Sequence, residues 1–155
     1  MQSELQIGRA TPADAAAILQ LQRCAYQSEA RLYQDWSLPP LLETQEQLQA
    51  EFATSVILKA ELNGSVVGAV RGRSCARRCA VGRLIVSPDW QGRGIGRALL
   101  QRIESEFPQV ECFELFTGAR SERNISLYQS LGYRQYRAQA ITDRLTLVWM
   151  ERCRG

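Results

Sequence analysis

The strongest constraint on the fold is an apolar run that leads through a turn into a glycine-rich segment and then into an amphipathic helix. Residues 84–86 are apolar, residues 87–90 contain a proline, and glycines stand at positions 92, 94 and 96. Apolar residues then recur at helical spacing over residues 94–107. The segment therefore predicts a strand, a loop and a helix in direct succession.

This loop has the chemistry of an anion-binding site. Glycines leave backbone amides uncovered, and a helix N-terminus adds a partial positive charge. Arg93 and Arg97 add formal charge, so the loop suits a pyrophosphate. A glycine-rich turn without a ligand is the alternative.

Three known phosphate-binding patterns can be compared with this loop. A P-loop is excluded because the chain has no Gly-Lys-Ser/Thr sequence. The Rossmann fingerprint needs glycines spaced G-x-G-x-x-G, whereas the spacing here is G-x-G-x-G after an expected antiparallel meander. The pattern Gln/Arg-x-x-Gly-x-Gly/Ala fits residues 91–96 at each specified position.

The strands, helices and turns expected along the rest of the chain predict one mixed α/β domain over residues 1–155. Asn63-Gly64 is a strong hairpin signal between two of its strands. The order βααβββαβαββ gives a mostly antiparallel sheet. The expected elements are a strand at 5–8, a helix from 11, helix ends and loop over 26–43, a helix at 44–52, strands at 56–62, 66–73 and 80–86, the helix at 94–107, a strand at 112–117, a helix at 124–131, and strands at 133–140 and 145–151.

The composition disfavours several classes of function. The chain has no histidine, which excludes a Ser-His or Cys-His nucleophile within it and predicts no metal site. Its 5 cysteines are odd in number and scattered, which predicts no disulfide framework. A net charge of +3 is too small to indicate nucleic-acid binding.

The sequence also gives no sign of a membrane partner. No apolar run approaches the ~20 residues that cross a bilayer. The first residues lack the basic start and apolar stretch of a signal peptide. We therefore expect a cytoplasmic protein.

With its glycine-rich loop, the chain resembles the GNAT superfamily of N-acetyltransferases over nearly its whole length. A second segment, Asn124 to Tyr133, is similar to the family's Asn-x-x-x-Tyr-x-x-x-Gly-Phe/Tyr element. The resemblance implies a sheet whose fourth and fifth strands splay apart between flanking helices. It also implies transfer of an acetyl group from acetyl-CoA, the cosubstrate, to a primary amine by direct attack. A non-catalytic protein that binds or senses acyl-CoA is the alternative.

The resemblance assigns roles to individual residues. Tyr128 is expected near the thioester sulfur, where it would protonate or stabilise the departing thiolate. Many family members carry a glutamate base on the fourth strand, but that strand has no carboxylate here. Glu114 on the fifth strand is the nearest candidate by sequence, and deprotonation through water is the alternative. The residues expected to bind the coenzyme are Leu84, Ile85, Val86, Gln91, Gly92, Arg93, Gly94, Ile95, Gly96, Arg97 and Asn124.

The acceptor site is expected in the segments that the resemblance does not fix, residues 26–43 and 141–143. Aromatic faces beside carboxylates favour a cationic amine, whether a small molecule or a peptide. The alternative is that the aromatic residues pack inward and the acids are solvated. The fold is also compatible with a homodimer. The predicted substrate-binding residues are Tyr26, Glu29, Tyr33 and Trp36, beside Asp35 and Asp143.

Overall fold

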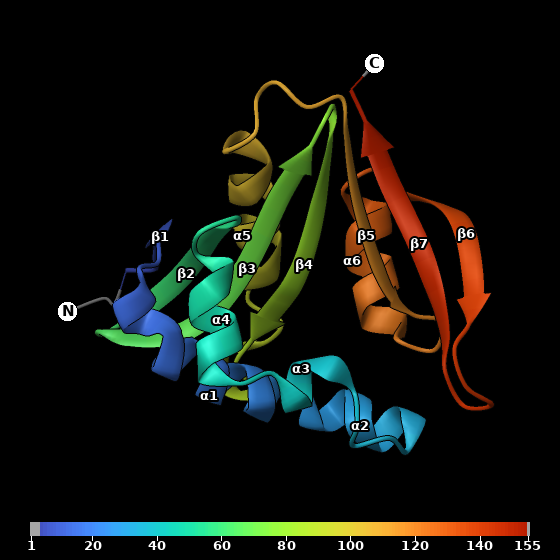
Figure 1. Cartoon of the computed structure of the whole chain (residues 1–155), viewed down its shortest axis with the longest axis horizontal. Coiled ribbons are helices and arrows are strands. Elements are labelled where there is room, and N and C mark those ends of the chain that lie inside the picture. The colour runs from blue at the N-terminus through green and yellow to red at the C-terminus, as the bar shows by residue number, and fades with distance from the viewer. Residues whose placement is uncertain (1–3, 155) are drawn as a thin grey trace.

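The computed structural model describes residues 4–154. In it, the chain forms one seven-stranded sheet with helices on both faces (Figure 1). The strand order is β1-β2-β3-β4-β5-β7-β6. The strands are β1 (Gln6–Arg9), β2 (Val56–Leu62), β3 (Ser65–Cys75), β4 (Arg78–Val86), β5 (Cys112–Gly118), β6 (Arg134–Ala140) and β7 (Thr146–Cys153). The α-helices are α1 (Ala15–Ala25), α2 (Gln27–Tyr33), α3 (Pro39–Leu42), α4 (Gln45–Glu51), α5 (Ile95–Ser105) and α6 (Glu122–Ser130), and short 3-10 turns lie at Pro12–Asp14 and Pro88–Trp90.

The expected separation of the fourth and fifth strands is confirmed. β4 and β5 form the one parallel pair of the described sheet, and they share backbone pairs only from Arg78↔Cys112 to Ala80↔Glu114. Beyond these pairs the two strands diverge, and α2 and α3 lie near their free ends (Figure 1). The second half of β4 therefore faces a gap instead of a neighbouring strand.

Local sequence signals account for the start of α4 and for the turn between β2 and β3. At α4, Thr44 Oγ1 accepts a hydrogen bond from the Gln47 amide at 3.1 Å, and the Gln47 side chain accepts one from the Thr44 amide at 2.9 Å. Asn63 and Gly64 take φ values of 53° and 78° in the β2–β3 hairpin, as a tight turn between twisted strands requires. The expected hairpin and helix cap are both confirmed.

The segment over residues 26–43 is more helical than the sequence predicts. It contains the helices α2 and α3. Gln34 ends α2 in a left-handed conformation, with a φ of 51°, and Pro39 stands in the first turn of α3. Both helices are short, so hydrophobic periodicity gives little signal. Helix α6 likewise begins at Glu122, two residues before the expected start.

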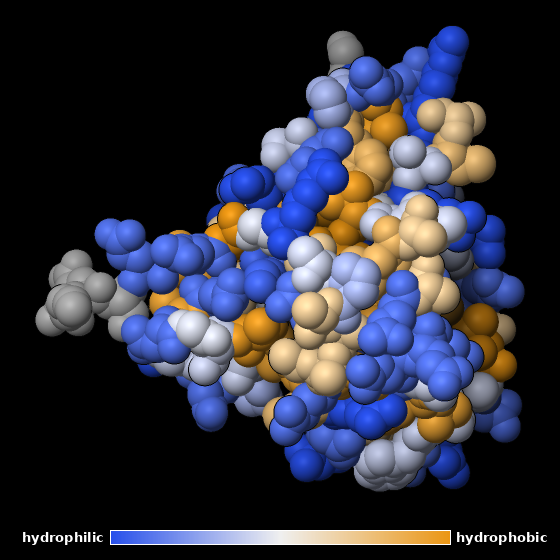
Figure 2. All heavy atoms as spheres, turned by 60° about the vertical axis from the view of Figure 1, so that its left-hand side comes forward, coloured by the Kyte–Doolittle hydropathy of each residue, from blue (hydrophilic) through white to orange (hydrophobic). Residues whose placement is uncertain are grey.

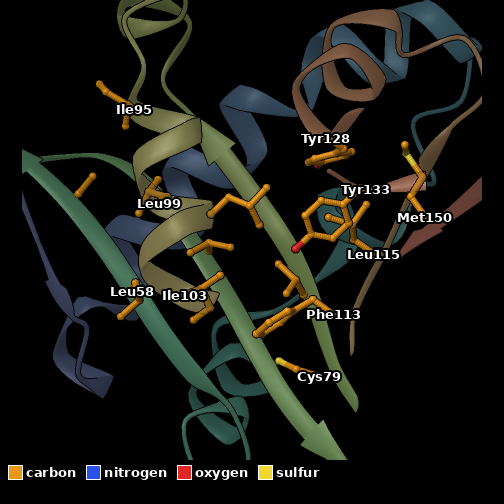
Figure 3. Close-up of a cluster of buried hydrophobic side chains, with 14 of the residues drawn as sticks. Leu58, Cys79, Ile95, Leu99, Ile103, Phe113, Leu115, Tyr128, Tyr133 and Met150 are labelled. Carbon is orange, nitrogen blue, oxygen red and sulfur yellow. The ribbon is translucent and has the colours of Figure 1, made fainter. Parts of the chain in front are cut away.

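Two hydrophobic clusters lie on opposite faces of the sheet. On one face, Leu99 and Ile103 of α5 pack toward Phe113 and Leu115 of β5 (Figure 3). On the other face, α1 and α4 cover β2, β3 and β4. Figure 2 shows one side of the molecule, where hydrophilic side chains cover much of the surface and hydrophobic ones appear between them. The second cluster consists of Ala15, Ile18, Leu19, Leu21, Leu48, Ile57, Ala69 and Ile85.

One disulfide corrects the expectation drawn from the cysteine count. Cys112 and Cys153 are bonded, 41 residues apart in the chain. They stand directly opposite each other on the antiparallel pair β5–β7, which brings their Cα atoms within 4.0 Å. The spacing of the cysteines along the chain does not predict this pairing, because the pairing depends on the register of β5 and β7. Cys24, Cys75 and Cys79 are free.

None of the described helices combines the length and the apolar character needed to span a membrane.

Close packing of α5 on β3 provides a test of the fold. A Cβ added at Gly68 would lie 2.9 Å from Leu99 Cδ1 and 3.1 Å from the Ile85 carbonyl oxygen. We predict that Gly68→Ala lowers the free energy of unfolding by about 1–3 kcal/mol, as overpacking does. Chemical denaturation measures this. The matched control is Gly8→Ala in β1, where an added Cβ meets nothing within 4 Å, and an equal loss in both variants would contradict the packing argument.

Candidate functional site

A cleft of about 1040 Å³ opens where β4 and β5 diverge. Its walls come from α1 and α2, the end of β4, the glycine-rich loop and α6. The residues that line it are Ala25, Tyr26, Ser28, Glu29, Leu32, Leu84, Ile85, Val86, Gln91, Gly94, Gly96, Arg97, Arg120, Ser121, Glu122, Arg123, Asn124, Ser126, Leu127 and Ser130. Most residues predicted to bind the coenzyme thus line the same cleft as Tyr26 and Glu29 of the predicted acceptor site.

The glycine-rich loop presents open backbone to this cleft. Gly92 and Gly94 have φ values of 76° and 84°, which L side chains rarely adopt. Gly94 is the N-cap of α5, and an added Cβ there would meet nothing within 4 Å. Ile95, in contrast, is buried at 4% exposure and anchors the helix in the core. The loop therefore sets the N-terminus of α5 against empty, accessible space.

Side chains brace the loop from two directions. Gln91 Nε2 donates to the Val86 carbonyl oxygen at 3.1 Å, and Arg123 of α6 donates to Gln91 Oε1 at 3.0 Å. Arg97 donates to Ser130 Oγ at 2.8 Å. Arg97 and Arg123 line the cleft and give it positive charge. Arg93 instead lies over the Trp90 ring, 4.8 Å from its centroid, and is not among the lining residues.

Tyr128 lies on the buried side of α6, in the larger hydrophobic cluster, and is not among the residues that line the cleft. Its side chain is 6% exposed, and its ring is 6.1 Å from that of Tyr133 (Figure 3). Burial is the main cause that raises the pKa of Tyr128 well above its ordinary value of 10.0, and the nearby Tyr26 and Glu29 raise it further. Its hydroxyl has no hydrogen-bond partner among the described residues, yet it is not one of the fully buried polar atoms. The phenol is therefore a protonated donor with no protein acceptor.

Asn124 joins α6 to the free half of β5. Its side-chain amide donates to Thr117 Oγ1 at 3.2 Å, and Thr117 is buried at 8% exposure. This contact holds Asn124 at the cleft wall, one helical turn before Tyr128.

A chain of hydrogen bonds links α2 to the start of α6. Ser121 Oγ donates to Glu29 Oε2 at 2.7 Å. Because its one proton is used there, Ser121 accepts at 2.8 Å from the Tyr33 hydroxyl. Ser121 and Tyr33 are 3% and 2% exposed, so the chain fixes Glu29 from the protein side. The Glu29 Oε1 atom has no hydrogen-bond partner among the described residues and remains available in the cleft.

Comparisons with known proteins agree with this geometry. A family model described as "Acetyltransferase (GNAT) family" matches residues 15–133. The chain belongs to this GNAT family.

Solved structures share the GNAT fold across almost the whole chain. An N-acetyltransferase from Staphylococcus aureus Mu50 matches with a TM-score of 0.79 and 23% identity, covering 97% of this chain and 99% of that chain. The PaiA N-acetyltransferase from Thermoplasma acidophilum, solved in complex with coenzyme A, has a TM-score of 0.78 and 15% identity over 97% of this chain and 99% of that chain. The yncA protein from Salmonella typhimurium, solved with its cofactor acetyl-CoA, has a TM-score of 0.76 and 23% identity over 96% of this chain and 93% of that chain.

Not all predicted site residues of this GNAT chain reach the cleft. Glu114 lies on the opposite face of β5 from the buried Phe113 and Leu115, because side chains alternate along a strand. It accepts a hydrogen bond from the Tyr136 hydroxyl at 2.9 Å and lies 3.6 Å from an Arg78 nitrogen. The structure therefore does not bring Glu114 to the cleft.

The predicted aromatic acceptor site is also only partly assembled. Trp36 is 56% exposed and does not line the cleft, and Tyr33 is buried in the hydrogen-bond chain. The carboxylate of Asp35 accepts hydrogen bonds from Ser37, which hold its pKa below the ordinary value. Asp143 lines a separate, smaller cavity. Tyr26 and Glu29 alone of this set line the main cleft.

The cleft includes functional candidates that sequence reasoning missed. Arg120, Ser121 and Arg123 come from the loop before α6 and from its first turn. A polar run directly before a helix could have suggested them, since such positions lie at the end of a strand and the start of a helix. Their inward placement depends on how α6 docks, which no local pattern predicts.

Proposed function

We propose that this chain transfers an acetyl group from acetyl-CoA to a primary amine. The observation that carries the proposal is the glycine-rich loop at the N-terminus of α5, open at the mouth of the gap between β4 and β5. The coenzyme complexes of PaiA and yncA, which share the fold, support the choice of cosubstrate.

The residues present fit a coenzyme at three points. The backbone amides of residues 91–96 and the charges of Arg97 and Arg123 suit its pyrophosphate. The second half of β4, which lacks a partner on β5, offers backbone groups to the pantetheine arm. Asn124 offers an amide to the same arm.

The reaction needs a bond exchange, the loss of two protons from the nitrogen of a protonated amine, and the gain of one proton by the departing thiolate. The amine nitrogen bonds to the acetyl carbonyl carbon, and the carbon–sulfur bond breaks from the tetrahedral intermediate. The thiolate then receives a proton from the Tyr128 hydroxyl, whose raised pKa keeps it protonated until that step, and the phenolate regains a proton as the nitrogen loses its second one. No covalent acyl-enzyme forms, so the protein contributes position and electrostatics.

Glu29 is the carboxylate best placed to take the proton of the amine. Amines are mostly protonated at neutral pH, so attack requires a base. Glu29 lines the cleft, is held through one oxygen by Ser121, and presents the other oxygen without a protein partner. Its charge also acts on the hydroxyls of Tyr26 and Tyr128, which places all three groups in one electrostatic neighbourhood.

Acetyl-CoA binding can be tested at the loop. We predict that acetyl-CoA raises the thermal midpoint of the wild type, because it binds the folded state. Gly94→Asp should abolish this shift by placing a negative charge and a strained side chain at the helix N-terminus. Differential scanning fluorimetry measures both.

The matched control is Gly64→Asp. Gly64 has a φ of 78° and open space around it, but it lies in the β2–β3 hairpin. The control therefore brings the same charge and backbone strain away from the cleft and should keep the shift. If Gly94→Asp also keeps it, the loop is not the coenzyme site.

Tyr128 is tested by removing its hydroxyl. We predict that Tyr128→Phe lowers kcat by about 10- to 100-fold, since one proton donor to the leaving group is lost. The affinity for acetyl-CoA should change little. Turnover is followed as free thiol released in the presence of a broad amine panel. Unchanged turnover, with the chemical step rate-limiting, would remove Tyr128 from the mechanism.

Glu29 is tested against a neighbouring carboxylate. Glu29→Gln can still accept a hydrogen bond from Ser121 but cannot take a proton, so we predict a fall in kcat of about 100-fold or more. Glu122→Gln is the control, because Glu122 also lines the cleft but is exposed and begins α6. Equal losses in both variants would indicate a general charge effect. If no amine releases thiol although acetyl-CoA binds, the protein binds acyl-CoA without catalysis.

A further inference from the structure

A buried ion pair lies beneath α1, next to the cleft. The two terminal nitrogens of the Arg71 guanidinium donate to the two oxygens of Glu43 at 2.7 and 3.1 Å. Gln22 Nε2 adds a third hydrogen bond, to Glu43 Oε1 at 3.0 Å. Burial alone would raise the pKa of Glu43, but the hydrogen bonds from Arg71 and Gln22 hold it below its ordinary value. Glu43 is therefore already neutralised by Arg71.

Arg83 stands beside this pair without a hydrogen-bond partner among the described residues. Its Nε is 3.9 Å from Glu43 Oε1, too far for a hydrogen bond. That Nε is fully buried and unpaired, while the side chain as a whole is 23% exposed. The two terminal nitrogens of the guanidinium also have no hydrogen-bond partner among the described residues, but they are not fully buried, so their donors are free.

The neighbouring groups only partly balance the positive charge of Arg83. Burial is the main cause that lowers its pKa, and Arg71 lowers it further. Tyr26, Glu43 and Glu51 act in the opposite direction. Of these, Glu43 is bound by Arg71, and Glu51 accepts a hydrogen bond from Ser55 at 3.0 Å. A partly buried cation that shares its only nearby ion-pair partner, Glu43, with a second arginine is costly, so its retention calls for a further partner.

Arg83 lies next to residues of the acceptor end of the cleft. It has a φ of 50°, at an irregularity in the β3–β4 register, and it belongs to the half of β4 that has no partner on β5. Residues in this conformation persist only where the surrounding structure holds them. Its neighbours Leu84 and Tyr26 both line the cleft. Arg83 itself does not line it and lies just beyond them.

Tyr26 lies within range of charges of both signs. Burial is the main cause that raises the pKa of its hydroxyl; Arg83 and Arg71 lower that pKa, and Glu29 and Glu43 raise it. The acceptor end thus offers a carboxylate for an ammonium group and a guanidinium for an anion, with an aromatic ring near both.

We propose that Arg83 binds a carboxylate on the acceptor, so that the substrate is an amino acid or a similar amine that carries a carboxylate. The inference rests on the proposed acetyl transfer and adds the class of acceptor. Arginine suits this role because its planar donors match the two oxygens of a carboxylate. The cationic acceptor expected from the sequence then carries a negative group as well.

Matched acceptor pairs test the proposal. The panel contains α-, β- and γ-amino acids, each beside its own carboxamide, so that the amine stays and the negative charge is removed. The wild type should prefer the carboxylate at one or more spacings. In Arg83→Gln, we expect kcat/KM for that carboxylate to fall by about 10- to 100-fold, the usual effect of a lost charged hydrogen bond. The value for the carboxamide should stay the same.

Two variants serve as controls. Arg73→Gln removes an exposed arginine of β3 and should leave the preference intact, which separates direct binding from long-range charge. Arg83→Lys keeps the charge but loses the planar donor geometry, so it should retain only part of the preference. It also carries the test if Arg83→Gln does not fold. Equal losses for carboxylate and carboxamide, or a wild type without preference, would overturn the proposal.

Binding of the N-acetylated products keeps this test separate from the proposed reaction. Calorimetry on the protein with bound coenzyme A compares N-acetyl amino acids with N-acetyl amino acid amides. Tighter binding of the carboxylate, lost in Arg83→Gln, supports the role of Arg83 even if no turnover is detected. Turnover of neutral amines, without selective carboxylate binding, overturns the role of Arg83 and leaves the acetyltransferase function in place.

Discussion

β4 and β5 share only three backbone pairs, from Arg78↔Cys112 to Ala80↔Glu114, and then separate. Each strand stays paired on its other side, β4 with β3 and β5 with β7. The gap therefore costs few hydrogen bonds within the protein, because the unpaired groups belong to one edge of each strand. The Cys112–Cys153 disulfide lies at the joined end and ties β5 to β7 there. The cleft opens at this separation, and the end of β4 forms part of its wall.

The two sides of the cleft carry different chemistry. The side formed by the glycine-rich loop and α6 presents backbone amides, Arg97 and Arg123, and suits phosphate groups. The side formed by α1 and α2 presents Tyr26 and Glu29, with Arg83 just behind them. Tyr128 belongs to α6 on the first side, and its pKa responds to Tyr26 and Glu29 on the second. This polarity matches a reaction in which a phosphate-bearing donor meets a small polar acceptor.

Glu114 and Glu29 illustrate how far sequence reasoning about the base could reach. Glu114 was the natural candidate because it stands on the strand next to the gap, but strand alternation turns it to the face that carries Tyr136. Glu29 was predicted to bind the acceptor, and the structure adds its contact with Ser121, 92 residues away in the chain. No periodicity or spacing connects two residues that are so distant.

The sequence by itself determined the features that depend on neighbouring residues. These include the glycine-rich loop before α5, the hairpin at Asn63-Gly64, the cap at Thr44 and the order of elements outside residues 26–43, since turns, caps and amphipathic faces are short-range effects. Only the tertiary structure decided which polar groups meet across the cleft. The bonding of Cys112 to Cys153, the chain from Tyr33 to Glu29 and the unpaired Arg83 all depend on strand register and helix docking. Strand register and helix docking are set by the burial of whole apolar faces. The free energy of that burial depends on contacts across the whole molecule, so no short segment of sequence predicts it.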